Sequence, residues 1–118
     1  MSESKIILLV TSMPASSVIE GNQNFCRQVF RGKKIGPVVE LDGMNPNEKE
    51  ERNILFAISE KRGLYPQIFI KINDEISFVG DFEKMNELND CNSLPPEILS
   101  ANPQIQTFDK VFAFFLNS

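Results

Sequence analysis

The apolar residues of the chain fall into short runs separated by polar turns. Residues 5–10 read KIILLV, a nearly continuous apolar run rich in β-branched side chains, which predicts a strand buried on both faces. Residues 37–42 predict a second strand. The runs at 66–72 and 75–80 predict two more strands, and because the turn-forming pair Asn73-Asp74 joins them, we expect a hairpin.

Between these strands the apolar spacing becomes helical. Ser17 and Glu20 fit a capping box, in which a hydroxyl accepts backbone N–H bonds and an acid follows three positions later, and Gly32 supplies a left-handed stop. A second helix is predicted to begin at the cap residue Asn45 and to end at Gly63. Its expected apolar stripe consists of Ile54, Leu55 and Ile58.

The last part of the chain predicts two further helices with a long connection between them. Asp81 is expected to cap a short third helix. Residues 90–106 hold three prolines and little periodicity, so they predict a long loop. Thr107 then caps a terminal helix whose apolar face is expected to pack on the sheet. That face consists of Phe108, Val111, Phe112 and Phe115.

The order of these elements, βαβαββα followed by one more helix, determines the expected fold. A strand–helix–strand unit requires two parallel strands with a right-handed crossover, and the hairpin adds antiparallel strands. We therefore predict a four-stranded mixed sheet with helices on both faces, which is the thioredoxin-like α/β architecture. At 118 residues, the whole chain (1–118) is expected to form a single domain.

Charge and hydropathy argue against nucleic acids and membranes as partners. The formal net charge of −4 argues against nucleic-acid binding, because phosphate contact needs clustered Lys and Arg. One basic cluster lies where the first helix should end, a position that suits the helix dipole. It consists of Arg27, Arg31, Lys33 and Lys34. Because no apolar run approaches the roughly 20 residues of a membrane helix and no export signal is evident, we expect a cytoplasmic protein without a membrane partner.

The chain contains no histidine and no Cys-x-x-Cys pair. These absences exclude Ser-His and Cys-His catalytic pairs and a histidine-ligated metal site. Cys26 lies within the apolar pattern of the first helix and is expected to be a buried thiol. Cys91 follows a polar stretch and is expected to be exposed. No metal or cofactor is predicted.

Three segments, taken in order, resemble a known family. KIILLVTSMPASS ends the first strand at a polar loop where glutaredoxins place their Cys-Pro-x-Cys motif. LYPQIF resembles the segment that carries the cis-proline of that fold, and FVGDFEKMNEL resembles its last strand and Gly-Asp turn. Together with KIG at 34–36 and VFAFFL at 111–116, they resemble the glutaredoxin-like family of SH3-domain-binding glutamic-acid-rich proteins. The resemblance covers residues 5–92 and 108–116.

This resemblance implies a groove like the one in which glutaredoxins bind the glutathione peptide. It implies a cis bond between Tyr65 and Pro66 and an anion-binding helix end at Gly80-Asp81. The Asp81 side chain competes for the same N–H groups, so any glutathione binding is expected to be weak. The predicted groove residues are Thr11, Ser12, Met13, Tyr65, Pro66, Gly80 and Asp81.

The chain also departs from that family. A Pro-x-x-Pro ligand needs two prolines spaced on a polyproline II helix, and because no such pair occurs here, binding to SH3 domains is not expected. Residues 90–106 look like an insertion relative to the family.

The polar loop at 12–17 contains no thiol, whereas thiol–disulfide exchange needs a thiolate. Ser16 and Ser17 are expected to cap the following helix. The sequence therefore predicts a redox-inactive interaction module, an adaptor or regulatory protein whose protein partner it does not identify. The alternative is a glutathione-binding protein or glutathione-dependent oxidoreductase that uses Cys26 or Cys91 as a non-standard cysteine.

Overall fold

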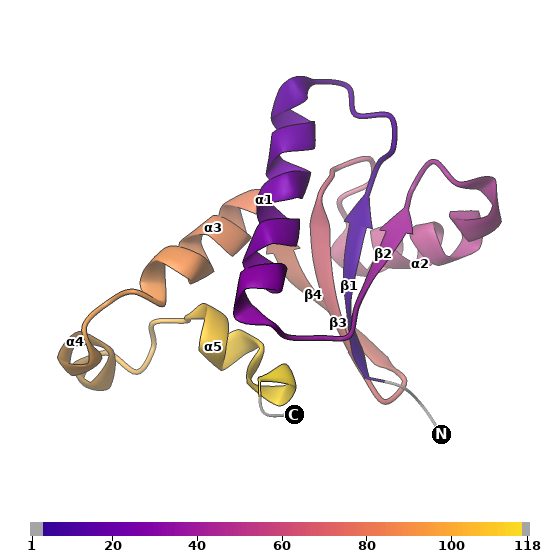
Figure 1. Ribbon diagram of the computed structural model, residues 1–118. Helices are drawn as coiled ribbons and strands as arrows, with labels where there is room; N and C mark the ends of the chain where they lie inside the picture. Colours follow the sequence, from indigo (N-terminus) through magenta and orange to yellow (C-terminus); the bar gives the residue numbers. More distant parts are fainter. Residues whose placement is uncertain (1–3, 117–118) are drawn as a thin grey trace.

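The computed structural model describes residues 4–116. Four strands form one mixed sheet in the order β2-β1-β3-β4 (Figure 1). β1 (Lys5–Val10) runs parallel to β2 (Val38–Asp42) and antiparallel to β3 (Gln67–Ile72). β3 and β4 (Glu75–Asp81) form the predicted antiparallel hairpin. The four predicted strands and the mixed α/β sheet are therefore confirmed.

β1 is a central strand, and its apolar side chains are buried on both faces of the sheet. Alternate side chains of a strand point to opposite faces. Ile6, Leu8 and Val10 belong to the core on one side, and Ile7 and Leu9 belong to the core on the other. None of the five is more than 5% exposed. The chain leaves this buried strand at residue 11, so the loop that follows starts from a fixed point.

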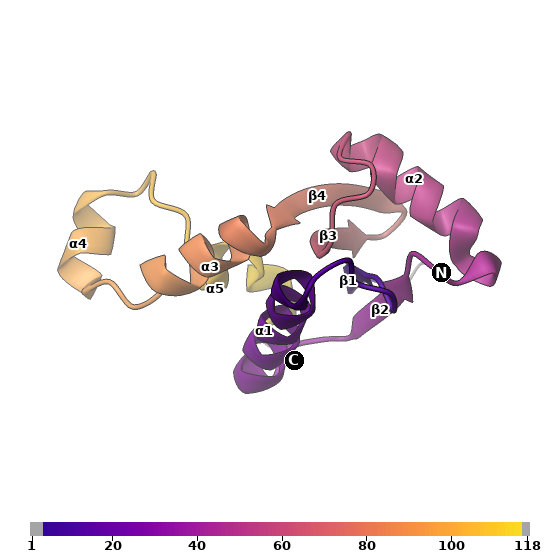
Figure 2. The same ribbon diagram turned by 90° about the horizontal axis from the view of Figure 1, so that it is seen from above.

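One face of the sheet is covered by α1 (Ser17–Lys33), α3 (Phe82–Cys91) and the short C-terminal helix α5 (Phe108–Val111) (Figures 1 and 2). Phe30 joins these helices, because its ring centroid lies 6.0 Å from that of Phe108 and 5.5 Å from that of Phe112. Cys26, Met85, Leu88 and Phe115 complete the helical side of this core.

The opposite face is covered by α2 (Lys49–Ser59), which follows the short 3-10 helix η1 (Pro46–Glu48) (Figure 2). Asn45 caps η1 rather than the helix that it was predicted to begin, since its side chain accepts the N–H of Asn47 and α2 begins at Lys49. The predicted apolar stripe of this helix is only partly right. Leu55 and Phe56 are buried, but Ile54 and Ile58 are exposed. The helix ends at Ser59, with Glu60 in the left-handed conformation that was expected of Gly63.

The ends of α1 differ from the prediction by one or two residues. Ser16, not Ser17, is the N-cap, because its hydroxyl accepts the N–H of Ile19 at 3.3 Å. Lys34, not Gly32, adopts the left-handed conformation at the C-terminal end, with φ of 55°. The helix therefore runs through Gly32 and carries the basic residues Arg31 and Lys33 in its last turn.

The region expected to be a loop, 90–106, contains a further helix, α4 (Pro96–Ala101). Proline is tolerated in the first turn of a helix, where no N–H is needed. The terminal helix is also shorter than expected. It breaks at Phe112, and a 3-10 turn η2 (Ala113–Phe115) follows. Its apolar face is nevertheless confirmed, because the buried residues include Phe108, Phe112 and Phe115. Among the described helices, none has both the length and the apolar character to cross a bilayer.

Candidate functional site

The register of the sheet places the predicted groove residues at one end of it. Leu9 pairs with Gln67, and Gln67 pairs with Asp81, so the end of β1, the start of β3 and the end of β4 are neighbours. Val10 pairs with Asp42 at the end of β2. The polar loop between β1 and α1 rises from this end of the sheet (Figure 1).

The start of the loop is held by a side chain that sequence reasoning missed, Gln23 of α1. Its Oε1 accepts the N–H of Thr11 at 2.7 Å, and its Nε2 donates to the carbonyl of Thr11 at 3.2 Å. Both residues are buried. The amide of Gln23 thus pairs with Thr11 as a neighbouring strand would, and it fixes the loop to the helix.

Asp42, at the end of β2, holds the next part of the loop. Its Oδ1 accepts the N–H of Ser12 at 3.0 Å and the N–H of Met44 at 2.9 Å. Partial burial raises the pKa of the Asp42 carboxyl, but the hydrogen bonds from Met44 and Ser12 outweigh it, and the pKa is lowered. The carboxylate is therefore the stable form in this position, and it joins two loops at the edge of the sheet.

The middle of the loop presents apolar side chains to solvent. The backbone N–H of Met13 donates to Thr11 Oγ1 at 3.1 Å, and the Met13 side chain is left 71% exposed. Val18, in the first turn of α1, is 68% exposed. These are the two most exposed large apolar side chains of the described residues, one within the loop and one in the helix that follows it.

Tyr65 and Pro66 enter β3 beside this loop, and the peptide bond between them is cis, as is the Gly36–Pro37 bond. Pro66 is fully buried. The Tyr65 ring packs on Phe56 with centroids 6.0 Å apart, and its hydroxyl lies against Gly43, where a Cβ would collide with it. Burial raises the pKa of Tyr65, with Arg52 opposing and Asp42 adding to the rise.

Gly80 and Asp81 form the turn into α3, where the Asp81 side chain already accepts a backbone N–H of the helix. Asp81 is the N-cap of α3, with its Oδ1 accepting the N–H of Lys84 at 3.1 Å. The side chain of Lys84 lies over Gly80, where a Cβ would collide with it, and its Nζ donates to Gln106 at 2.8 Å. The Asp81 side chain therefore already occupies a backbone N–H at the start of α3.

The two cysteines are both free thiols, and they occupy different environments. Cys26 is fully buried in the core beneath α1. Burial raises the pKa of its thiol to about 12; Arg27 lowers the pKa and Asp81 raises it further, both by smaller amounts. Cys91, the last residue of α3, is half-buried. Neither thiol lies in the loop before α1, where a helix N-terminus would favour a thiolate.

A thiol-specific reagent should separate these two residues in the native protein. We expect Cys91 to react with 5,5′-dithiobis(2-nitrobenzoate), and Cys26 to stay unmodified from pH 7 to 9. A raised pKa leaves the thiol protonated below that pKa, so at pH 9 only about one Cys26 in a thousand is thiolate. The Cys91→Ser variant, with Cys26 alone, should therefore react only after unfolding. Rapid modification of that native variant would contradict the buried assignment.

Of the two loop-holding residues that sequence reasoning missed, Gln23 was marked by a weak signal. Gln23, Cys26 and Phe30 lie at i, i+3 and i+7, so a polar amide stands within the core-facing stripe of α1. A polar residue there needs a buried partner. Asp42 carried no comparable signal, because an acid after a strand is common in turns.

Within the part of the chain that the structure describes, no three His, Cys, Asp or Glu side chains gather closely enough to hold a metal ion. The site is therefore a polar loop held by Gln23 and Asp42, with Met13 exposed on the loop and Val18 exposed in the first turn of α1. Compared with protein-family models and with curated proteins, the chain gives no match.

Proposed function

We propose that the chain is a non-catalytic interaction module of thioredoxin-like architecture, related in kind to the glutaredoxin-like proteins of the SH3-domain-binding glutamic-acid-rich family. The sheet order β2-β1-β3-β4, with one helix on one face and several on the other, supports the architecture. The family rests on the sequence segments that resemble it.

The observation that supports the non-catalytic role is that hydrogen bonds already occupy the backbone groups at the start of the loop before α1. Exchange chemistry needs a thiolate at this helix N-terminus. Here the N-cap is the hydroxyl of Ser16, and the first backbone groups of the loop are taken by Gln23 and Asp42. The sulfur in α1, Cys26, is buried and protonated. The loop thus keeps a fixed shape with no reactive group on it.

A role in protein contact is supported by two exposed apolar side chains, one on the loop and one in the first turn of the helix that follows it. Met13 and Val18 have large exposed fractions of 71% and 68%. Burial of exposed apolar side chains against a partner is favourable. Two free thiols fit a reducing compartment, so we place the module in the cytoplasm. Any glutathione binding should be weak, because Asp81 already caps α3.

An activity assay tests the first half of this proposal. The purified protein is incubated with a small glutathione mixed disulfide, reduced glutathione and glutathione reductase. We expect disulfide reduction at the rate of the protein-free control, with no change in the Cys91→Ser variant. Enzymatic turnover that disappears with Cys91→Ser would establish the glutathione-dependent oxidoreductase instead.

A capture experiment tests the second half. The native protein and a Met13→Asp/Val18→Asp variant are used to retain proteins from lysate of cells that express the chain. Acid in the first turn suits a helix dipole, so the variant should fold. We expect the retained partner to fall about tenfold or more, the equivalent of at least 1.4 kcal/mol. Ile98→Asp, a similar change on exposed α4, is the matched control and should retain it fully. Equal capture by all three proteins would exclude the loop as the contact surface.

A further inference from the structure

The outer edge of β2 offers backbone groups to a further strand. β2 lies at the end of the sheet order, so within residues 4–116 β1 is its one neighbouring strand. In a parallel pair, alternate residues direct both backbone groups to the neighbour. Ile6 N–H donates to Pro37 at 2.9 Å and Gly43 N–H donates to Val10 at 2.8 Å, which fixes the odd-numbered residues of β2 as those that face β1. The N–H and C=O groups of residues 38 and 40 therefore face away from the sheet.

This open edge is short and has defined ends. At one end the strand begins only at Val38. At the other, the carbonyl of Asp42 accepts the N–H of Asn45 at 3.1 Å, and the N–H of Asp42 faces Glu48 Oε1 at 3.4 Å. A strand added here would pair with the stretch 38–40 and no further, so the edge suits a short peptide segment rather than a long strand.

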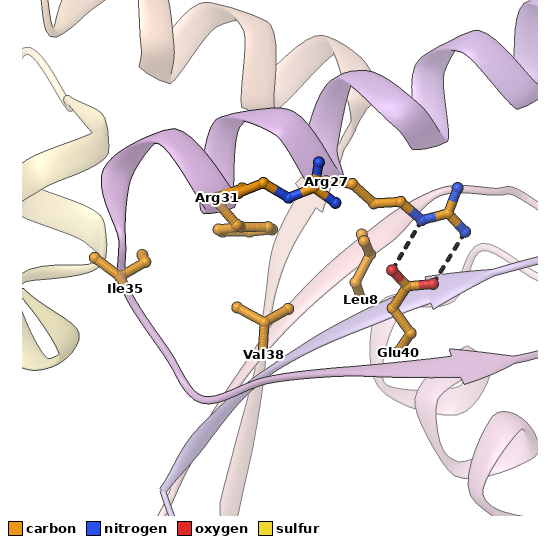
Figure 3. A pocket seen from close by; sticks show the side chains of 7 residues that line it. Leu8, Arg27, Arg31, Ile35, Val38 and Glu40 are labelled. Carbon is orange, nitrogen blue, oxygen red and sulfur yellow. Dashed lines mark hydrogen bonds and ion pairs between the residues drawn. The ribbon is translucent and has the colours of Figure 1, made fainter.

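A cavity of about 220 Å³ opens beside the same edge, between α1 and β2. Its apolar wall consists of Leu8, Phe30, Ile35 and Val38. Figure 3 shows Val38 and Glu40 rising from β2 toward Arg27 and Arg31 of α1. The volume is enough for one large apolar side chain, and a residue on a strand paired with β2 would point toward it because side chains on one face of a sheet lie next to each other.

Two arginines line the cavity, and among the described residues only one of them is paired with an acid. Arg27 makes two hydrogen bonds to Glu40, at 2.8 and 3.0 Å (Figure 3), and donates a third to Asn24 at 2.7 Å. Arg31 also lines the cavity and is exposed, and among the described residues it has no ion-pair partner. A guanidinium favours a carboxylate, which it can bind with two parallel hydrogen bonds. Asp42 and Glu48 make the far end of the edge acidic, so a ligand carboxylate is favoured at the Arg31 end.

We propose that the β2 edge binds an extended segment of a partner protein that carries an apolar residue and an acidic residue two positions apart. The segment pairs with the backbone of 38–40 by strand addition, the apolar side chain fills the cavity, and the carboxylate binds Arg31. Alternate residues of a strand share a face, which sets the two-residue spacing. This surface is separate from the Ser12–Ser17 loop, and it involves no thiol.

Selection from a random decapeptide library displayed on phage tests the proposal. We expect the selected sequences to be enriched in Asp or Glu two positions from a Leu, Ile, Val or Phe. Binding of a selected peptide should weaken about tenfold or more in Arg31→Glu, since the guanidinium that binds the carboxylate is replaced by an acid that repels it. Lys49→Glu, an equal charge change on the exposed start of α2, is the matched control and should bind as the native protein does.

Methylation of the peptide backbone then tests the strand pairing. One synthetic peptide carries N-methyl groups on the amides that face β2, and a second carries them on the alternate amides that face solvent. We expect the first to lose binding and the second to keep it, with amide shifts in the native protein centred on residues 38–40. The proposal would be overturned if no peptide is selected, if the selected peptides lack acidic residues, or if both methylated peptides lose binding equally. It would also be overturned if sedimentation shows that a second copy of this chain occupies the edge.

Discussion

Removal of residues 107–118 is expected to abolish the cooperative fold. Phe108, Phe112 and Phe115 are buried in the core that α1 and α3 share. Full burial of a phenylalanine contributes about 1.5–3 kcal/mol, so the three together approach the 5–15 kcal/mol that holds a typical domain folded. Urea unfolding followed by circular dichroism measures the effect. A truncated chain that unfolds at the native urea concentration would show that this segment is a detachable tail.

Two single substitutions give the same test without truncation. Phe112→Ala removes a fully buried ring that contacts Phe30 and Phe108, and should lower the free energy of unfolding by about 3–5 kcal/mol. Phe114→Ala removes the same side chain from a position that is 60% exposed, two residues away, and should change it by about 0.5 kcal/mol or less. Equal effects of the two variants would contradict the burial of this segment.

Replacement of Gln23 by leucine is expected to lower the free energy of unfolding by about 2–6 kcal/mol. Leucine keeps most of the volume but leaves the buried N–H and C=O of Thr11 without partners, and each such group costs roughly 1–3 kcal/mol. Gln28→Leu, the same change at an exposed position of α1, is the control and should have little effect.

Amide hydrogen exchange distinguishes local loosening from global destabilisation in the Gln23→Leu variant. The amide of Thr11 should exchange faster than expected from the change in global stability alone, because its acceptor is gone. Unchanged protection at Thr11 and native stability would mean that Gln23 does not hold the loop.

The strands were predictable because each rests on a strong local signal. KIILLV is short, apolar and rich in β-branched residues, which favours a buried strand, and the Asn73-Asp74 turn favours the hairpin; Asn73 indeed adopts a positive φ of 56°. The face of α2 was not predictable in the same way. Residues 54–58 are all apolar, so periodicity alone cannot choose among them, and the packing of Phe56 on Tyr65 decides which side faces the sheet.

Proline misled the prediction for 90–106. Pro95-Pro96 indicated a loop, yet Pro96 lies in the first turn of α4, where a fixed φ suits the helix and no donor is lost. For the site, the sequence predicted the loop, its missing thiol and the Asp81 cap. It did not predict the side chains that hold the loop, because the contacts of Gln23 and Asp42 cross from other elements, 12 and 30 residues away.

The rigid attachment of the loop to α1 has a consequence for avidity. Val18 and Arg31 lie on one helix, 13 positions apart, so at about 1.5 Å per residue they are held roughly 20 Å from each other. A partner with two short motifs joined by a linker that spans this distance would bind both surfaces at once, and the second contact would form at a high effective concentration. A linker too short to span it would gain nothing, so if both proposed surfaces bind, the length of α1 would select partners by the spacing of their motifs.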